Sequence, residues 1–333
     1  MIKRFQSSDF NYFFDGKTGY TAVWGKRPED DPECAPFPMI ADIEITTICN
    51  GIGNYGPCPF CYKSNTAKGE YMPFDIAKKV IDKLPKELTQ IAFGVDAKLE
   101  SNPDWYKIFN YAREKTFVPN VTVADVNEEA AKKIASVCGA VAVSRYADKN
   151  ICYDTVKRLT DEGMKQVNIH CMASKNTLEM LYETIDDIRT DKRLEKLNAI
   201  VFLSLKRKGR GKSYTSLSSE EFAQIVKTCM KYGIRYGFDS CSGHKFLNAI
   251  RGTVNEKLAQ FCTPCESTRE SCYINVRGEY FPCSFTEGTP GWEKGIDVVN
   301  CSDFINDVWQ NPKTHNFREM LLMNDCRCPI YNV

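Results

Sequence analysis

Short apolar runs alternate with helical patterns through residues 40–232, and this alternation restricts the possible folds more than any other feature of the sequence. Each run has the length of a strand, and each following stretch has apolar residues at helical spacing. Strands and helices in alternation imply parallel pairing through right-handed crossovers. The sequence therefore predicts an α/β fold, a partial TIM-like (β/α)6 barrel. The expected strands are residues 40–46, 90–94, 120–124, 140–144, 166–171 and 199–205, with a further run at 234–238, and the expected helices are residues 74–84, 104–115, 128–137, 154–162, 177–189 and 219–232.

The chain divides into three predicted regions. Residues 1–38 form an N-terminal extension, in which two aromatic-rich runs flank a turn at residues 15–19 and predict a β-hairpin. Residues 39–240 form the barrel. Residues 241–333 are rich in Cys, Gly and Pro and contain a second hairpin signal around Arg277-Gly278. Because so little periodic hydrophobicity buries little surface, we expect a small domain that a bound cluster stabilises.

The chain has 16 cysteines but only three histidines. Its first residues lack a signal-peptide pattern, and no apolar run approaches the length of a membrane span. We therefore expect a cytoplasmic protein with reduced thiols and no membrane partner. Clustered cysteines in that compartment indicate metal ligands, whereas scattered ones such as Cys138, Cys152 and Cys229 are expected to be small buried hydrophobic residues. The net charge of +1 does not indicate polyanion binding.

Three cysteines, Cys49, Cys58 and Cys61, lie on one loop directly after the first predicted strand. In parallel barrels the chemistry lies at this end of the strands. Three thiolates hold a [4Fe-4S] cluster with one iron left open for a small molecule. The alternative is a zinc knuckle, for which Cys58 and Cys61 alone would suffice.

This arrangement resembles the radical SAM superfamily, whose hallmark is three cysteines after the first barrel strand with an aromatic residue, here Phe60, before the third. The two residues between Cys58 and Cys61 match the family spacing, whereas eight residues separate Cys49 from Cys58 where the family usually has three. A longer loop is tolerated, because the entropic cost of closing a loop grows slowly with length. The resemblance implies an enzyme that reductively cleaves S-adenosylmethionine (SAM) to a 5'-deoxyadenosyl radical, which abstracts a hydrogen from a substrate. It also implies an electron donor such as flavodoxin or ferredoxin.

The resemblance further implies residues that contact SAM. Gly94 and Asp96 end the second strand, where the family binds the methionine amino group. Ser144 and Arg145 end the fourth strand, where the family contacts the ribose and the carboxylate, and arginine can pair with a carboxylate through two hydrogen bonds. Ordinary alternatives are a loop turn at Gly94 and a surface ion pair at Arg145. Phe60 and Tyr62, which flank the third cysteine, complete the expected cofactor contacts.

A second group of eight cysteines follows residue 240. The segment from Cys265 to Cys283 resembles the auxiliary-cluster signature of radical SAM proteins with SPASM or twitch extensions. Twelve residues separate Cys265 from Gly278, and four separate Gly278 from Cys283. The resemblance implies that an upstream cysteine and one near the C-terminus complete the site, and Cys241 and Cys328 fit these places. We expect one auxiliary [4Fe-4S] cluster; a structural zinc site is the alternative. A second auxiliary cluster stays open on the remaining residues Cys262, Cys272, Cys301 and Cys326.

Residues 206–212, after the sixth strand, hold five cations. A basic run is usually a solvated face, but a loop after a barrel strand overlooks the active site, so Lys206, Lys208 and Arg210 are candidate ligands of a substrate anion. The resemblance implies a peptide or protein substrate that is modified after translation, although about 39 residues before the first barrel strand are too few for an appended leader-binding domain. A nucleotide, a nucleic acid or another anionic small molecule is an alternative substrate. A non-catalytic iron-sulfur or zinc protein that binds nucleic acid is an alternative of another class.

Overall fold

The computed structural model describes residues 1–146 and 148–331. In this part of the chain one sheet has ten strands, in the order β10-β9-β8-β7-β6-β5-β4-β11-β12-β13. Neighbours from β10 to β11 pair in parallel, and the last two strands pair antiparallel. The strands are β4 (Ile40–Glu44), β5 (Gln90–Gly94), β6 (Val118–Val123), β7 (Ala140–Ser144), β8 (Val167–Ala173), β9 (Ala199–Ser204), β10 (Tyr236–Phe238), β11 (Ser271–Ile274), β12 (Glu279–Phe281) and β13 (Ile296–Asp297).

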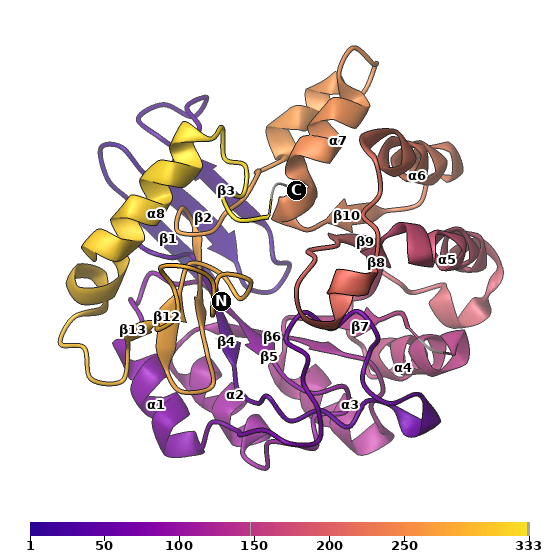
Figure 1. Cartoon of the computed structure of the whole chain (residues 1–333), viewed down its shortest axis with the longest axis horizontal. Coiled ribbons are helices and arrows are strands. Elements are labelled where there is room, and N and C mark those ends of the chain that lie inside the picture. The colour runs from indigo at the N-terminus through magenta and orange to yellow at the C-terminus, as the bar shows by residue number, and fades with distance from the viewer. Residues whose placement is uncertain (147, 332–333) are drawn as a thin grey trace.

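Helices connect the parallel strands and lie in an arc outside the sheet (Figure 1). They are α1 (Phe74–Lys83), α2 (Trp105–Glu114), α3 (Glu128–Val137), α4 (Lys149–Asp161), α5 (Leu178–Thr190) and α6 (Ser219–Tyr232). The predicted partial (β/α)6 barrel is confirmed, with β10 as a further parallel strand. Helix α4 begins five residues before the predicted start at residue 154, because the Asp148 side chain accepts a hydrogen bond from the Asn150 N–H and caps the helix there.

The two faces of the barrel sheet differ in burial. The face toward the helices is a close-packed apolar core, as Ile200 and Phe202 of β9 show, and burying each such side chain contributes about 1.5–3 kcal/mol. On the concave face most of the alternate residues are only partly buried, and Asp42 and Thr122 are exposed although their strands are central in the sheet. The concave face is therefore open to a ligand, and the helix face supplies the stability.

The N-terminal extension forms its own antiparallel sheet of β1 (Ile2–Gln6), β2 (Asn11–Asp15) and β3 (Thr21–Trp24). The hairpin predicted around residues 15–19 is present, and β1 adds a strand that the sequence did not predict. The Tyr12 hydroxyl donates a hydrogen bond of 2.6 Å to the Glu87 carbonyl oxygen, just before β5 begins. This sheet therefore packs at the amino ends of the barrel strands, away from the ends where the cysteine loop lies.

The C-terminal region continues the barrel sheet. Strand β11 pairs in parallel with β4, and the chain turns at Arg277-Gly278 into β12, as the second hairpin signal predicts. Helix α8 (Pro312–Met323) lies on the side of this extension, whereas α7 (Gly243–Ile250) packs against α6 (Figure 1). The loops that hold the C-terminal cysteines therefore sit beside the strand that leads into the N-terminal cysteine loop.

Short turns of tighter or wider helix complete the described chain. No helix in residues 1–146 or 148–331 combines the length and apolar character needed to cross a bilayer. The short turns are 3₁₀ helices at Gly53–Tyr55, Lys175–Thr177, Lys192–Leu194, Gly209–Ser213, Ser240–Ser242 and Glu256–Phe261, and a π-helical turn at Ile305–Trp309.

Candidate functional site

The loop that follows β4 carries Cys49, Cys58 and Cys61 at the carboxyl end of the barrel. It folds back on itself at Gly51, whose φ is 73° and whose hypothetical Cβ would lie 1.8 Å from the carbonyl carbon of Gly56. Only glycine fits this close approach of two backbone segments. The turn returns the chain so that the second and third cysteines face the first.

Hydrogen bonding links two of these thiols directly. The contact between the Cys58 and Cys61 side chains lowers the pKa of Cys61 and raises that of Cys58, and Cys49 is near enough for its charge to raise the pKa of Cys58 further. The charge of the Arg210 guanidinium opposes the rise in the pKa of Cys58 and adds to the fall in that of Cys61. A thiol next to a cation gives up its proton readily, and the resulting thiolate is the form that binds a metal.

The fit of this loop to an iron-sulfur cluster rests on Arg210. In the described residues no three His, Cys, Asp or Glu side chains form a ready-made metal site, so a cluster would draw the three thiols together. The Nη2 atom of Arg210 is buried and has no hydrogen-bond partner within residues 1–146 and 148–331. Because an unsatisfied buried donor is costly, this nitrogen fits an anionic group held by the neighbouring thiols.

Aromatic side chains flank the third cysteine. The Phe60 ring packs edge-on against Tyr146 and Tyr214, with ring centroids 6.3 and 5.9 Å away. The Tyr62 ring lies 4.2 Å from that of Phe285, two residues beyond Cys283. Phe60 therefore faces the ends of the central strands, and Tyr62 faces the C-terminal cysteine region.

The four residues at strand ends that are expected to contact SAM have different surroundings. Gly94 and Ser144 end strands β5 and β7, and neither is fully buried. The Asp96 carboxylate accepts hydrogen bonds from the backbone N–H groups of residues 98, 100 and 101, so it shapes its own loop. Arg145 is 4% exposed and pairs with Glu183 of helix α5 at 2.9 Å, on the outer side of the barrel. Gly94 and Ser144 thus stand at the barrel mouth, whereas Asp96 and Arg145 are engaged by other protein groups.

The structure brings the four expected auxiliary ligands into one neighbourhood. Cys241 lies within electrostatic range of Cys265 and Cys283, and both of these lie within range of Cys328. Burial raises the pKa of Cys265 to about 12 and that of Cys283 to about 11, while backbone N–H groups that donate to each sulfur oppose the shift. Amide donors aimed at sulfur stabilise a ligating thiolate.

The other C-terminal cysteines have different partners. The Cys262 thiol donates to the Gly243 carbonyl oxygen at 3.6 Å, and the Cys301 thiol donates to the Val298 carbonyl oxygen at 3.2 Å. Cys272 is buried in the main core, and Cys326 lies near Arg269. The sequence left open a second auxiliary cluster held by these four cysteines. Their different surroundings do not bring them together in one site. Cys138, Cys152 and Cys229 are buried in the core, as predicted.

The basic loop after β9 turns its cations inward. Lys206 is only 5% exposed and pairs with Asp239. The Lys208 Nζ donates to the carbonyl oxygens of Phe285 and Glu287, and Arg210 donates to those of Cys58 and Asn65. These contacts with the protein weaken the expectation that the three residues bind a substrate anion.

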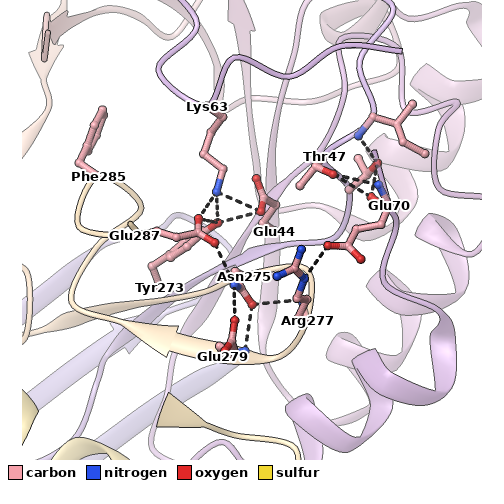
Figure 2. A network of polar contacts seen from close by, with 12 residues as sticks. Glu44, Thr47, Lys63, Glu70, Tyr273, Asn275, Arg277, Glu279, Phe285 and Glu287 are labelled. Atoms are coloured by element: carbon pink, nitrogen blue, oxygen red, sulfur yellow. Dashed lines mark hydrogen bonds and ion pairs between the residues drawn. The ribbon is translucent and has the colours of Figure 1, made fainter. Parts of the chain in front are cut away.

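A buried polar network that the sequence did not reveal joins the two cysteine regions (Figure 2). The Lys63 Nζ contacts Glu287 directly, lies 3.2 Å from Glu44 Oε2 and donates a 2.8 Å hydrogen bond to the Tyr273 hydroxyl. The same hydroxyl donates to Glu44 at 2.9 Å. Burial raises the pKa of Glu44, and Lys63 opposes that shift. A signal was present in the sequence, because Asp42 and Glu44 place two carboxyl groups in a short strand that is otherwise apolar, and Lys63 lies two residues beyond Cys61.

Two more carboxyl groups face the concave side of the sheet. Asp42 keeps accessible surface, but protein surrounds its carboxylate, and this desolvation raises its pKa to about 7. Desolvation also raises the pKa of Glu266 to about 7, and Asp42 contributes to that shift. His170 on β8 has its pKa lowered to about 4 by burial, so it is neutral near pH 7. The concave face therefore offers groups that bind or transfer protons near neutral pH.

Comparisons with known proteins give a structural match without a sequence match. No protein-family model matches the chain, and neither does any curated protein. The chain is similar to SuiB from Streptococcus suis bound to its precursor peptide SuiA, with a TM-score of 0.67 at 13% identity over 86% of this chain and 67% of SuiB. SuiB alone and SuiB bound to S-adenosylmethionine each match with a TM-score of 0.65 at 12% identity, over 85% of this chain and 68% of SuiB.

Proposed function

We propose that this chain, which has the partial TIM-like barrel fold of the radical SAM enzymes, is itself a radical SAM enzyme. The observation that supports this most is the loop at the carboxyl end of the first barrel strand. It carries three thiols, two of them in hydrogen-bond contact, beside the guanidinium of Arg210, whose buried Nη2 atom has no hydrogen-bond partner in the described part of the chain. This is the end of the barrel at which parallel folds carry out chemistry.

The roles follow from the positions of the residues. Cys49, Cys58 and Cys61 would hold a [4Fe-4S] cluster with an open iron, which together with SAM supplies a 5'-deoxyadenosyl radical for hydrogen abstraction. Phe60 and Tyr62 border this loop and would limit the space around SAM. Electrons would come from a small donor such as flavodoxin or ferredoxin, in the reducing cytoplasm that free thiols require.

For the remaining SAM contacts we propose a direct role at two residues and an indirect one at two others. Gly94 and Ser144, at the barrel mouth, would touch the cofactor. Asp96 fixes the loop after Gly94 through its accepted hydrogen bonds, and Arg145 fixes the end of β7 against helix α5. The last two would act by holding the cofactor-binding segments in place.

We also propose that Cys241, Cys265, Cys283 and Cys328 hold one auxiliary [4Fe-4S] cluster. The thiols come from separate segments, and Cys265 and Cys283 lie within electrostatic range of each other and of both Cys241 and Cys328. Four thiolates equally suit a structural zinc ion, and metal analysis distinguishes the two. The buried Lys63 network lies between this group and the N-terminal cysteine loop.

A peptide is the substrate that we propose. SuiB, whose fold this chain shares, was solved with its precursor peptide bound. Lys206, Lys208 and Arg210 make their contacts with protein groups, which supports a peptide over an anionic small molecule held by these cations. The partly exposed concave face provides the surface on which a peptide side chain would meet the cofactor.

Anaerobic reconstitution tests the enzyme proposal. The purified chain should take up about eight irons, as two four-iron clusters require, and dithionite with SAM should then release 5'-deoxyadenosine. Cys58→Ala should abolish this release, whereas Cys34→Ala, at a partly buried cysteine outside both groups, should preserve it. Zinc in place of iron, or undiminished release from the Cys58 variant, would overturn the proposal. The substrate is tested with deuterated peptides and nucleotides, of which only a peptide should transfer deuterium into 5'-deoxyadenosine.

A further inference from the structure

The basic loop of residues 206–210 points its alternate cations at three different parts of the candidate site. It begins after β9 and runs into the 3₁₀ turn Gly209–Ser213. Lys206, Lys208 and Arg210 are buried or half-buried, whereas Arg207 and Lys212 in the same run are exposed. Burying a charge is costly unless a partner compensates it. The groups that surround the three inward cations therefore indicate the role of each cation.

Arg210 lies against the backbone of the N-terminal cysteine loop. Its Nε donates to the Cys58 carbonyl oxygen at 3.1 Å, its Nη1 donates to that of Asn65 at 3.0 Å, and its own N–H donates to that of Cys61 at 3.0 Å. The first two bonds fix the guanidinium plane beside the thiols, and the third holds the Arg210 backbone against the same loop. Among the described residues the buried Nη2 atom has no hydrogen-bond partner, whereas Nε and Nη1 both donate to the cysteine loop.

Lys206 stands in the same relation to the C-terminal cysteines. Its Nζ pairs with Asp239 and is in hydrogen-bond contact with the Cys241 thiol, two residues further along. The ring of Phe285 lies 4.7 Å from the same nitrogen. The charge of Lys206 also reaches Cys283. Lys206 is thus a buried cation in contact with one candidate ligand and within electrostatic range of another.

Lys208, which lies between Lys206 and Arg210 in the sequence, holds the loop that follows Cys283 through hydrogen bonds. Its Nζ donates to the carbonyl oxygens of Phe285 at 3.1 Å and Glu287 at 2.6 Å. This loop also carries Glu287, the partner of Lys63. One short segment therefore contacts the backbone or side chains of both cysteine groups.

We propose that residues 206–210 form a cationic brace that tunes both candidate clusters, with Arg210 donating to sulfur of the group held by Cys49, Cys58 and Cys61, and Lys206 to the thiolate of Cys241. The inference rests on the proposed function, because it needs iron at both sites. A nearby positive charge favours the reduced form of a cluster, which carries one more electron. Hydrogen bonds to sulfur and outer contacts of this kind also slow the loss of metal.

The test neutralises one cation at a time in the reconstituted full-length protein. Lys206→Met and Arg210→Gln are compared with Arg207→Gln and Lys212→Gln, which remove the same charge from exposed positions of the same run. Each cluster is measured alone, by placing the variants in a Cys283→Ala background for the N-terminal cluster and in a Cys58→Ala background for the auxiliary one. The readouts are the reduction potential, followed by electron paramagnetic resonance, and the rate of iron loss to a chelator.

Arg210→Gln should shift the potential of the N-terminal cluster to more negative values and speed its iron loss about tenfold, with little effect on the auxiliary cluster. Lys206→Met should instead shift the potential of the auxiliary cluster to more negative values and speed its iron loss, with little effect on the N-terminal cluster. Arg210→Lys and Lys206→Arg keep the positive charge, so their reduction potentials should lie closer to that of the unaltered protein than those of the neutral variants. They also replace the neutral variants in the test if those fail to fold.

Two outcomes are kept apart. If the unaltered protein binds no iron, the proposed function itself fails. If it binds iron but Lys206→Met and Arg210→Gln leave both potentials unchanged, or shift them no more than Arg207→Gln and Lys212→Gln do, the proposed function stands and the cationic brace is refuted.

Discussion

Replacing Lys63 with methionine removes a buried cation that contacts Glu44, Glu287 and Tyr273 together. The Lys63 and Glu44 side chains are 13% and 7% exposed, so water can replace little of the lost interaction. Removing one partner of a buried pair costs about 3–5 kcal/mol. Because the Glu287 side chain is 26% exposed and screened, we expect the lower end, about 3 kcal/mol of unfolding free energy near pH 8.

The loss should depend on pH, and the sign follows from Glu44. Burial already raises the pKa of Glu44 in the fold, and Lys63 opposes this shift. Without Lys63 the pKa of Glu44 rises further, so the folded variant binds a proton that the unfolded chain releases near pH 4.5. Stability is then retained at low pH and lost as pH rises through the folded pKa. Lys63→Met should therefore be destabilised by only about 1–2 kcal/mol at pH 5, since one pKa unit corresponds to about 1.4 kcal/mol.

Urea unfolding under anaerobic, reducing conditions, followed by tryptophan fluorescence and circular dichroism, measures these values. Lys68→Met, on an exposed lysine of the same loop, should change stability by less than about 0.5 kcal/mol. The double variant Lys63→Met/Glu44→Gln should recover part of the loss, because it removes the uncompensated charge. A Lys63→Met loss below about 1 kcal/mol at pH 8, or one that is equal at pH 5 and pH 8, would refute this reasoning.

Three further predictions concern other parts of the fold. Gly51→Ala should cost more than about 2 kcal/mol and impair iron uptake, because its side chain would meet the Gly56 backbone, whereas Gly163→Ala, at φ 88° in open space, should cost only about 1 kcal/mol. Asp42→Asn should flatten the fall in unfolding free energy between pH 5 and pH 8, because the raised pKa of Asp42 makes the fold lose stability as pH rises through about 7; an unchanged profile would contradict its desolvation. Ser218→Ala should lower the urea midpoint by the equivalent of about 1 kcal/mol, since Ser218 caps helix α6 by accepting from the Glu221 N–H.

Local patterns in the sequence predicted the barrel because each strand carries its own signal. Ile200 and Phe202 face the helices at a period of two, and the Ser218 cap marks the start of α6. Strand β1 was missed because apolar and polar residues do not alternate along it: the apolar Ile2 points outward, and of the inward residues Lys3 and Phe5 only Phe5 packs on the aromatic cluster. Helix α4 was placed too late because its first turn, from Lys149, is polar and depends on the Asp148 cap.

The candidate site was only partly accessible to sequence reasoning. Cysteine spacing led to the two groups that the structure brings together, because spacing and turn residues are local properties. The partners of Lys63 could not be predicted, since Tyr273 and Glu287 lie more than 200 residues away along the chain. The inward orientation of Lys206 and Arg210 was missed for the same reason, as a run of cations gives no sign of the carbonyl and carboxylate groups that distant segments supply.

The pairing of β11 with β4 has a consequence for the synthesis of the chain. Strand β4 lies near residue 40, but the partner that covers its outer edge is made more than 200 residues later. At about 5–20 residues per second, the ribosome leaves that edge without its partner for roughly 10–50 seconds. An unpaired strand edge is a template for association with other chains. The strand that leads into Cys49 is therefore completed among the last, and a nascent chain that stalls before Ser271 should depend on chaperones to remain dispersed.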